Sequence, residues 1–337
     1  MLNIITRPFD SINGPNKVVK NLIKGLELIR YPYVINKDIN STNRLYIPNN
    51  IFALNYLNKT SAKTIIGPNL FVLPKDIPKI FNIKNAIYLQ NSKWTYALWL
   101  KLGFDKEKFN YWPCGIDTEE FPNVWSKDLN KPVLIYFKQR NPNLLSGIEK
   151  ILNEKNIKYN LITYGYYFEK EFKEALANCS FIIWLGRQES QGIALQEALS
   201  SNIPMIVIDA KSLFDTFDKN GYQFPEDLRN FETTSVPYFN DKCGIIIKYI
   251  NDLPQAIDNM FSQFCSFNPR DYVIENLSLQ KQAVDFVKIY EYWGLTIEDG
   301  YTEYLLNEKD YKELTVFKIL IKIKNRIANN LLLLQKY

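Results

Sequence analysis

Residues 187–204, RQESQGIALQEALSSNIP, place Glu189 and Glu197 eight positions apart with Gly192 between them. A carboxylate accepts hydrogen bonds from two hydroxyls at once, which suits the vicinal diols of sugars and ribose. The first N–H groups of a helix bind anionic phosphate, and glycine lets the phosphate come close. The stretch therefore predicts two hydroxyl-binding acids on either side of a phosphate seat at Gly192. The spacing by itself is a weak signal, and on that ground alone Glu189 is better explained as a loop charge and Glu197 as a solvated helix residue.

The chain has 337 residues, 46% of them hydrophobic and none of them histidine. This is enough for one large or two medium domains with their own cores. The absence of histidine excludes Ser-His-Asp triads, Cys-His pairs and metal sites with histidine ligands. Chemistry must come from carboxylates, lysine, arginine, tyrosine, serine and backbone amides.

The cysteines lie far apart and form no Cys-x-x-Cys pair, so we expect buried thiols in a reducing cytoplasm and no metal site. They are Cys114, Cys179, Cys243 and Cys265. The opening residues, MLNIITRPFD, suggest a strand and a loop rather than a signal peptide, and no run of 18 uncharged apolar residues occurs. We therefore predict a cytoplasmic protein.

The net charge of +5 is concentrated in residues 316–337, VFKILIKIKNRIANNLLLLQKY, which contain five basic residues and no acid. A nucleic-acid binder would spread basic residues over a face among aromatic residues, so we expect no nucleic-acid partner. As a helix, this segment would be basic and amphipathic. That pattern predicts peripheral contact with an anionic membrane, or packing against the body or a second subunit.

Short apolar runs alternate with helical periods, which is typical of α/β folds with parallel sheets. The first half predicts strands at 2–6, 44–47, 63–67, 86–90 and 109–112, and helices at 15–29 and 91–103. The second half predicts strands at 132–137, 159–163, 180–185, 205–209 and 244–247, and helices at 143–155, 169–178, 193–202 and 252–264. Ligands of such doubly wound sheets bind at the carboxyl ends of the strands.

A polar stretch with proline at each end, PNVWSKDLNKP (122–132), separates the two halves. We predict a first domain at 1–125, a second at 126–269, one long helix at 270–293, and a tail at 294–337 that is amphipathic from 316. Pro269 fits the preference for proline at the first position of a helix.

Residues 189–207, ESQGIALQEALSSNIPMIV, resemble the donor-binding stretch of the retaining family 4 glycosyltransferases. NGPNKVVKNLIKGL, KFNYWPCGIDTEEFP and FNPRDYVIENLS resemble other parts of that family and occur in the same order. The resemblance covers residues 1 to about 293. It implies the GT-B fold, in which two Rossmann-like, doubly wound domains face each other across a cleft and a C-terminal helix crosses back.

Carried over by position, the resemblance implies that Glu189 contacts the hydroxyls of the donor sugar and Glu197 the ribose of the nucleotide. Ser190, Gln191 and Gly192 would supply amides that face the phosphates. These residues form the wall that we expect on the second domain.

The family also uses two cations after the first strand of its second domain, where this chain has Lys138 and Arg140. At an extended strand end, their spacing would turn both toward one anion; surface charges are the alternative. Tyr164 and Gly165, after the next strand, would form the edge for the nucleobase, or be ordinary loop residues.

On the first domain, Gly14 and Asn16 would approach the sugar–phosphate linkage from the opposite wall. A second Gly-Pro-Asn, at 67–69, would line the acceptor side. Both segments are also good turn chemistry. Asn91, Ser92 and Lys93 lie where the family needs a polar group, although this chain lacks the histidine that many members have there.

The sequence thus predicts transfer of a sugar from a UDP- or GDP-sugar to a hydroxyl of a glycan or lipid-linked acceptor. Glu189, Lys138 and Arg140 would be the catalytic residues, and no metal or other cofactor is expected. Retention of the anomeric configuration is favoured, because an inverting enzyme needs a general base, for which Asp10 is the earliest candidate. The alternatives are a catalytically silent binding protein of the same fold and a nucleotide-sugar 2-epimerase.

Overall fold

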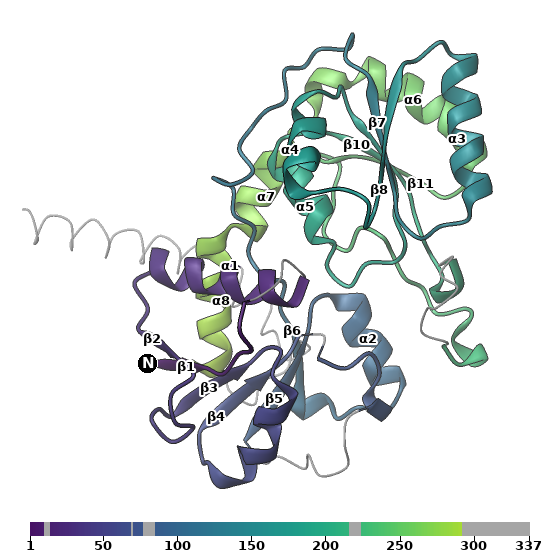
Figure 1. Cartoon of the computed structure of the whole chain (residues 1–337). Coiled ribbons are helices and arrows are strands. Elements are labelled where there is room, and N and C mark those ends of the chain that lie inside the picture. The colour runs from purple at the N-terminus through teal and green to yellow at the C-terminus, as the bar shows by residue number, and fades with distance from the viewer. Residues whose placement is uncertain (10–13, 69, 77–84, 216–223, 292–337) are drawn as a thin grey trace, which may run out of the picture. The chain divides into compact units, whose positions relative to one another are not determined.

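The computed structural model describes residues 1–9, 14–68, 70–76, 85–215 and 224–291. Two parallel sheets, one from each half of the chain, are each accompanied by helices (Figure 1). This confirms the predicted α/β fold with two doubly wound units.

The first sheet has six strands in the order β2-β1-β3-β4-β5-β6, all parallel. They are β1 (Leu2–Ile4), β2 (Tyr33–Ile35), β3 (Arg44–Ile47), β4 (Lys63–Ile66), β5 (Ala86–Gln90) and β6 (Phe109–Tyr111). Sequence analysis missed β2, which is a three-residue edge strand that is only partly buried. So short a run carries no period.

The second sheet has five parallel strands in the order β11-β10-β9-β7-β8. They are β7 (Val133–Phe137), β8 (Tyr159–Thr163), β9 (Ile182–Leu185), β10 (Met205–Ile208) and β11 (Gly244–Ile247). The helices α3 (Pro142–Glu154) and α6 (Leu253–Ser262) lie on one face, and α4 (Glu169–Ala177) and α5 (Ile193–Ser200) on the other (Figure 1).

Each sheet reverses its strand order once. Counted within its own half, the order is 2-1-3-4-5 in the second sheet and 2-1-3-4-5-6 in the first. The reversal lies between β7 and β9 in one and between β1 and β3 in the other. Loops that leave neighbouring strands in opposite directions open a crevice at such a point, where doubly wound proteins bind ligands.

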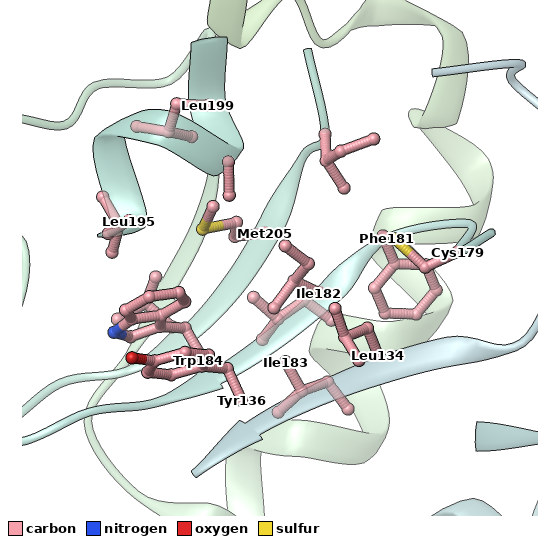
Figure 2. Packing of buried hydrophobic residues seen from close by; sticks show 14 of the residues in the cluster. Leu134, Tyr136, Cys179, Phe181, Ile182, Ile183, Trp184, Leu195, Leu199 and Met205 are labelled. Atoms are coloured by element: carbon pink, nitrogen blue, oxygen red, sulfur yellow. The ribbon is translucent and has the colours of Figure 1, made fainter. Parts of the chain in front are cut away.

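The core of the second sheet fixes α5. All four residues of β9 are buried, and the Trp184 ring stacks on Tyr136 of β7 with their centroids 3.8 Å apart. From α5, Leu195 and Leu199 point toward the sheet (Figure 2). The helix that carries Glu197 is therefore anchored by apolar burial.

Three of the four cysteines are buried thiols, as predicted. The exposed Cys265 is the exception, because it lies in a one-turn 3-10 segment (Phe264–Ser266) after α6.

The prediction of a single long helix at 270–293 is wrong. Two helices, α7 (Pro269–Leu277) and α8 (Leu279–Glu291), are separated by Ser278, whose backbone is extended. Here Ile116 N–H donates to the Leu277 carbonyl at 2.7 Å. A Cβ on Gly115 would lie 2.6 Å from the Leu279 Cα, so only glycine allows the chains to approach this closely.

Because of this break, α7 contacts the half of the chain with the second sheet and α8 packs against the first sheet. Arg270, in α7, donates to the Ser200 carbonyl at the end of α5, at 2.7 Å. In α8, the Phe286 ring packs edge-on against Tyr46 of β3, and the Gln282 carbonyl accepts from the Trp112 indole at 2.9 Å. The segment thus crosses back to the first sheet, as the resemblance implies.

The remaining helix bounds are α1 (Gly14–Leu28) and α2 (Lys93–Lys101) beside the first sheet. Among the described residues, none of the helices combines the length and the apolarity needed to cross a membrane. Asp10, Asn69 and the tail at 294–337 lie outside the described residues.

Candidate functional site

The loop from β9 into α5 opens into a cavity of about 400 Å³. Gly192 precedes the helix with a left-handed backbone, φ 81°, which favours glycine. No side chain caps this helix start, and the first-turn N–H groups have no partner within the helix. Ser190, Gln191, Gly192, Ile193 and Ala194 line the cavity. The predicted phosphate seat therefore faces a real cavity.

The cavity is lined by three acids and two bases, drawn from both halves of the chain. These charged residues are Lys17, Lys138, Glu169, Glu189 and Glu197. The other lining residues outside the 190–194 loop are Gly14, Pro15, Val18, Pro68, Asn91, Tyr164, Gly165, Tyr167 and Phe172. Both predicted glutamates and the predicted lysine thus meet in one place.

Glu189 and Lys138 come from the two loops that leave the reversal point of the second sheet. Lys138 Nζ lies 2.6 Å from Glu189 Oε1, and both side chains are about nine-tenths buried. The backbone of Glu189 is fixed on both sides, because its N–H donates to the Thr234 carbonyl at 3.0 Å and its carbonyl accepts from the Trp94 indole at 2.8 Å. The carboxylate is therefore presented by a rigid loop.

Lys138 also lies 4.3 Å from the centre of the Tyr164 ring, a cation–π distance. That ring is 46% exposed, so part of it remains open to a ligand. Gly165 follows with φ 85°. The predicted nucleobase edge therefore adjoins the predicted phosphate-binding cation.

Glu197 is buried and forms an ion pair with Lys17 of α1. Burial raises the pKa of Glu197 to about 7, against the opposing effect of Lys17. Burial also lowers the pKa of Lys17, but Glu197 and Glu169 outweigh it and hold that pKa above its usual value. Lys17 therefore stays cationic, while Glu197 titrates near neutral pH.

The expectation that Lys138 and Arg140 face one anion is wrong. Gln139, between them, has a left-handed backbone with φ 49°, so the alternation of an extended strand does not hold. Arg140 turns inward and donates to the carbonyls of Gly186 and Ile208 at 2.9 and 3.0 Å. It braces the ends of β9 and β10 and does not line the cavity.

The side chain of Gln191 connects the α5 loop to the first half of the chain. Its Oε1 accepts from the Cys114 N–H at 3.0 Å and from Asn91 Nδ2 at 3.1 Å, and its Nε2 donates to the Cys114 carbonyl at 2.9 Å. Gln191 lines the cavity, and its side chain joins two segments about 80 to 100 positions away in sequence.

Asn91 lines the cavity and has a buried side-chain acceptor. The Cys114 N–H can only donate, which fixes Gln191 Oε1 as an acceptor and Asn91 Nδ2 as a donor. The Asn91 Oδ1 is buried and accepts no hydrogen bond within the described part of the chain. The next two residues, Ser92 and Lys93, do not line the cavity. Ser92 interacts with Thr95 at the start of α2, and Lys93 is exposed.

Of the residues predicted on the first wall, Gly14 and Pro68 line the cavity, and Asn16 does not. Asn16 is buried, and its Oδ1 accepts from Asn49 at 3.2 Å. It lies two positions after Gly14, on another face of α1, so it braces this helix start from within.

Sequence reasoning missed Lys17 and Glu169. Lys17 lies one turn into the helix that begins at Gly14, and Glu169 is the first residue of α4. A basic residue just after a glycine loop and an acid at a helix start were visible signals, but nothing indicated that they meet. Among the described residues, no three Cys, Asp or Glu side chains are grouped closely enough to hold a metal ion.

No protein-family model matches the sequence, and no curated protein matches it. Solved structures with 10 to 14% sequence identity share its fold. HepE from Anabaena, in a complex with UDP and glucose, matches with a TM-score of 0.54 at 11% identity, over 86% of this chain and 99% of that one. Sucrose-phosphate synthase from Thermosynechococcus elongatus matches with 0.53 at 11%, over 86% and 98%. The lipopolysaccharide outer core galactosyltransferase WaaB matches with 0.50 at 14%, over 85% and 99%.

These three are GT-B glycosyltransferases, and their similarity extends over both sheets of this chain. The predicted GT-B fold is therefore confirmed.

Proposed function

We propose that this protein transfers a sugar from a nucleoside diphosphate sugar to a hydroxyl of a glycan or lipid-linked acceptor, with retention and without a metal ion. One observation carries the proposal: the start of α5 opens into a cavity whose charged side chains are the pair Glu189–Lys138 and Lys17 with its two acids, Glu197 and Glu169. The N–H groups and lysines there can bind phosphates, and the carboxylates can accept hydrogen bonds from hydroxyls. A nucleotide sugar needs both kinds of group.

The diphosphate would bind at Gly192–Ala194 beside Lys138. Cleavage of the sugar–phosphate bond builds negative charge on the departing phosphate. The helix start and Lys138 line the same cavity, and preorganised electrostatics of this kind is often the largest contribution to catalysis. Arg140 would act by holding the ends of β9 and β10, as its two carbonyl contacts suggest.

The sugar would lie between Glu189 and Asn91. Glu189 offers carboxylate oxygens, and the Asn91 Oδ1 is a buried acceptor whose orientation is fixed by Gln191. A buried acceptor without a partner costs free energy that a ligand hydroxyl would recover. Asn91 thus supplies a polar group on the first wall in a chain without histidine.

The ribose would bind Glu197, and the base would lie against Tyr164 and Gly165. UDP is the first nucleotide to test, because HepE forms its complex with UDP; GDP is the second.

Retention is supported by the state of the acids in the cavity. Glu189 is paired with Lys138, while Glu197 and Glu169 are both paired with Lys17. An inverting reaction needs a carboxylate that is free to take the proton of the acceptor hydroxyl. Glu189, the acid expected beside the sugar, is therefore better placed to bind than to deprotonate.

The acceptor would bind along the carboxyl edge of the first sheet. A second cavity of about 560 Å³ lies at the ends of β1 and β2, beside the 3-10 helix Ile51–Lys59. It combines the amides of Asn36, Asn40 and Asn50 with the exposed rings of Phe52 and Tyr56. Rings that stack and amides that hydrogen-bond suit a glycan.

Turnover by the wild type and by Glu189→Gln tests the proposal. We expect UDP-glucose or a GDP-sugar to bind, and Glu189→Gln to lower transfer or donor hydrolysis by about 100-fold or more, with nucleotide affinity nearly unchanged. Glu154→Gln, on the exposed face of α3, should match the wild type.

If no nucleotide sugar binds, or if Glu189→Gln turns over like the wild type, the proposal is wrong. Binding without any turnover would instead favour a silent binding protein of the same fold. An inverted product, or activity that requires Mn²⁺, would overturn the proposed mechanism.

A further inference from the structure

Lys17 is a cation of the first half of the chain that contacts two acids of the second. From α1, its Nζ forms an ion pair with Glu197 of α5 and lies 3.3 Å from Glu169 Oε2 of α4. All three side chains line the same cavity. Lys17 therefore occupies one carboxylate oxygen that the ribose would need under the proposed function.

Glu169, the second partner of Lys17, would keep Lys17 paired with an acid if the contact with Glu197 were broken. Glu169 is held by Lys173 at 3.1 Å, and Lys173 in turn lies 3.4 Å from Glu120. Glu169 thus stays in position whether or not Lys17 is bound to Glu197. Because breaking a buried ion pair is costly only when a charge is left uncompensated, this second acid lowers the cost of the exchange.

The charges around Glu197 are mostly acidic. Among the described residues, those that interact with it electrostatically include Lys17 on α1, Glu169 on α4, Glu120 and Cys114 in the segment after β6, and Tyr167 before α4. Lys17 is the cation of this set. Burial already raises the pKa of Glu197 to about 7 with Lys17 present, so the loss of Lys17 must raise that pKa further.

The cavity as a whole also depends on this cation. It is lined by three carboxylates against Lys17 and Lys138. Without Lys17, a diphosphate would approach three acids and a single lysine. Both effects have the same sign: the loss of Lys17 weakens nucleotide binding.

We propose that Lys17 is a positioning residue for the nucleotide: it holds Glu197 as an oriented carboxylate in the empty site and passes to Glu169 when the ribose binds. This inference rests on the proposed function. The contrary possibility, a lysine that merely blocks the ribose site, predicts tighter binding when Lys17 is removed.

The test compares UDP with 2′-deoxy-UDP by calorimetric titration between pH 6.5 and 9.5. The ratio of the two affinities isolates the ribose contact from the phosphates. We expect the wild type to prefer UDP by about tenfold at pH 8, and Lys17→Met to lose most of this preference at pH 7.5 and to regain it toward pH 9.5. Lys17→Arg, which keeps the charge, should retain it.

Lys20→Met is the matched control, because Lys20 is an exposed lysine of the same helix outside the cavity. Lys17→Met with a wild-type preference at every pH, or with tighter UDP binding, overturns the inference and leaves the proposed function intact. A loss of preference that does not change with pH also overturns it. If neither UDP nor GDP binds the wild type, both fail.

Discussion

The two sheets share one strand order, but the loops at their reversal points differ in chemistry. In the second sheet, these loops carry Lys138 and Glu189, whose side chains are about nine-tenths buried and 2.6 Å apart. In the first sheet, the cavity at the ends of β1 and β2 combines amides such as Asn36 and the open ring of Phe52, 68% exposed, with charged residues that include Lys37 and Asp38. Topology therefore locates both crevices, and the residue types decide what each can bind.

Burial makes the two regions unequal in energetic terms. A buried charge pair loses several kcal/mol of stabilisation when one partner is removed, about 3–5 in typical cases. An exposed ring that stacks on a ligand contributes on the order of 1 kcal/mol. Substitutions at the second sheet should therefore have large effects on the donor side, and those at the first sheet should have small effects on the acceptor side.

The largest effect is expected for Lys138→Met. It removes the cation from the phosphate side and leaves the Glu189 carboxylate unpaired. We expect kcat to fall by about 10²- to 10³-fold, measured as UDP release with a saturating donor. Lys150→Met, on an exposed side chain, is the control.

Arg140→Met is the comparison for Lys138→Met. Arg140 was predicted to face the same diphosphate as Lys138, but it binds two backbone carbonyls. The substitution should lower the free energy of unfolding by about 1–3 kcal/mol, with a smaller loss of kcat than Lys138→Met. An equal loss of kcat in both variants, at unchanged stability, would restore Arg140 to the catalytic set.

An intermediate effect is expected from pH. Burial raises the pKa of Glu197 to about 7, and the ribose hydroxyls donate to its ionised form. Lowering the pH from 8 to 6 protonates most of this acid, so UDP affinity should fall by about tenfold. Titration of wild type and Glu197→Gln checks the assignment, since the variant has no such group to titrate. A variant with the full pH dependence of the wild type would contradict it.

The smallest effect is expected for Phe52→Ala in the second cavity. Loss of one exposed stacking ring should raise the acceptor KM by about three- to tenfold, while the affinity for UDP stays unchanged. Tyr249→Ala removes another exposed ring, outside both cavities, and should change neither constant. A changed UDP affinity in Phe52→Ala would show that the two cavities are not separate in function.

Sequence analysis identified the residues of the second half that line the cavity because their signal is local. The buried strand, Gly192 and the spacing of Glu189 and Glu197 all lie within 20 residues, so periodicity and helix-start chemistry were sufficient.

The misses have two physical origins. The left-handed backbone at Gln139 and the extended Ser278 are single-residue conformations that no period reports. The pairing of Lys17 with Glu197 joins residues 180 positions apart, and the Asn91–Gln191 contact joins residues 100 apart. Such contacts depend on how the two halves of the chain pack together. The residue patterns of a single sequence do not reveal that packing.

The proposed function depends above all on the start of α5 as the seat of a diphosphate. A structure of crystals soaked with UDP would show whether the phosphates bind there. The expected result has phosphate oxygens within hydrogen-bonding distance of the N–H groups of Gly192 and Ile193, with the ribose on Glu197 and Lys17 moved to Glu169. A nucleotide bound elsewhere, or phosphates distant from Gly192 with the Lys17–Glu197 pair intact, would contradict it.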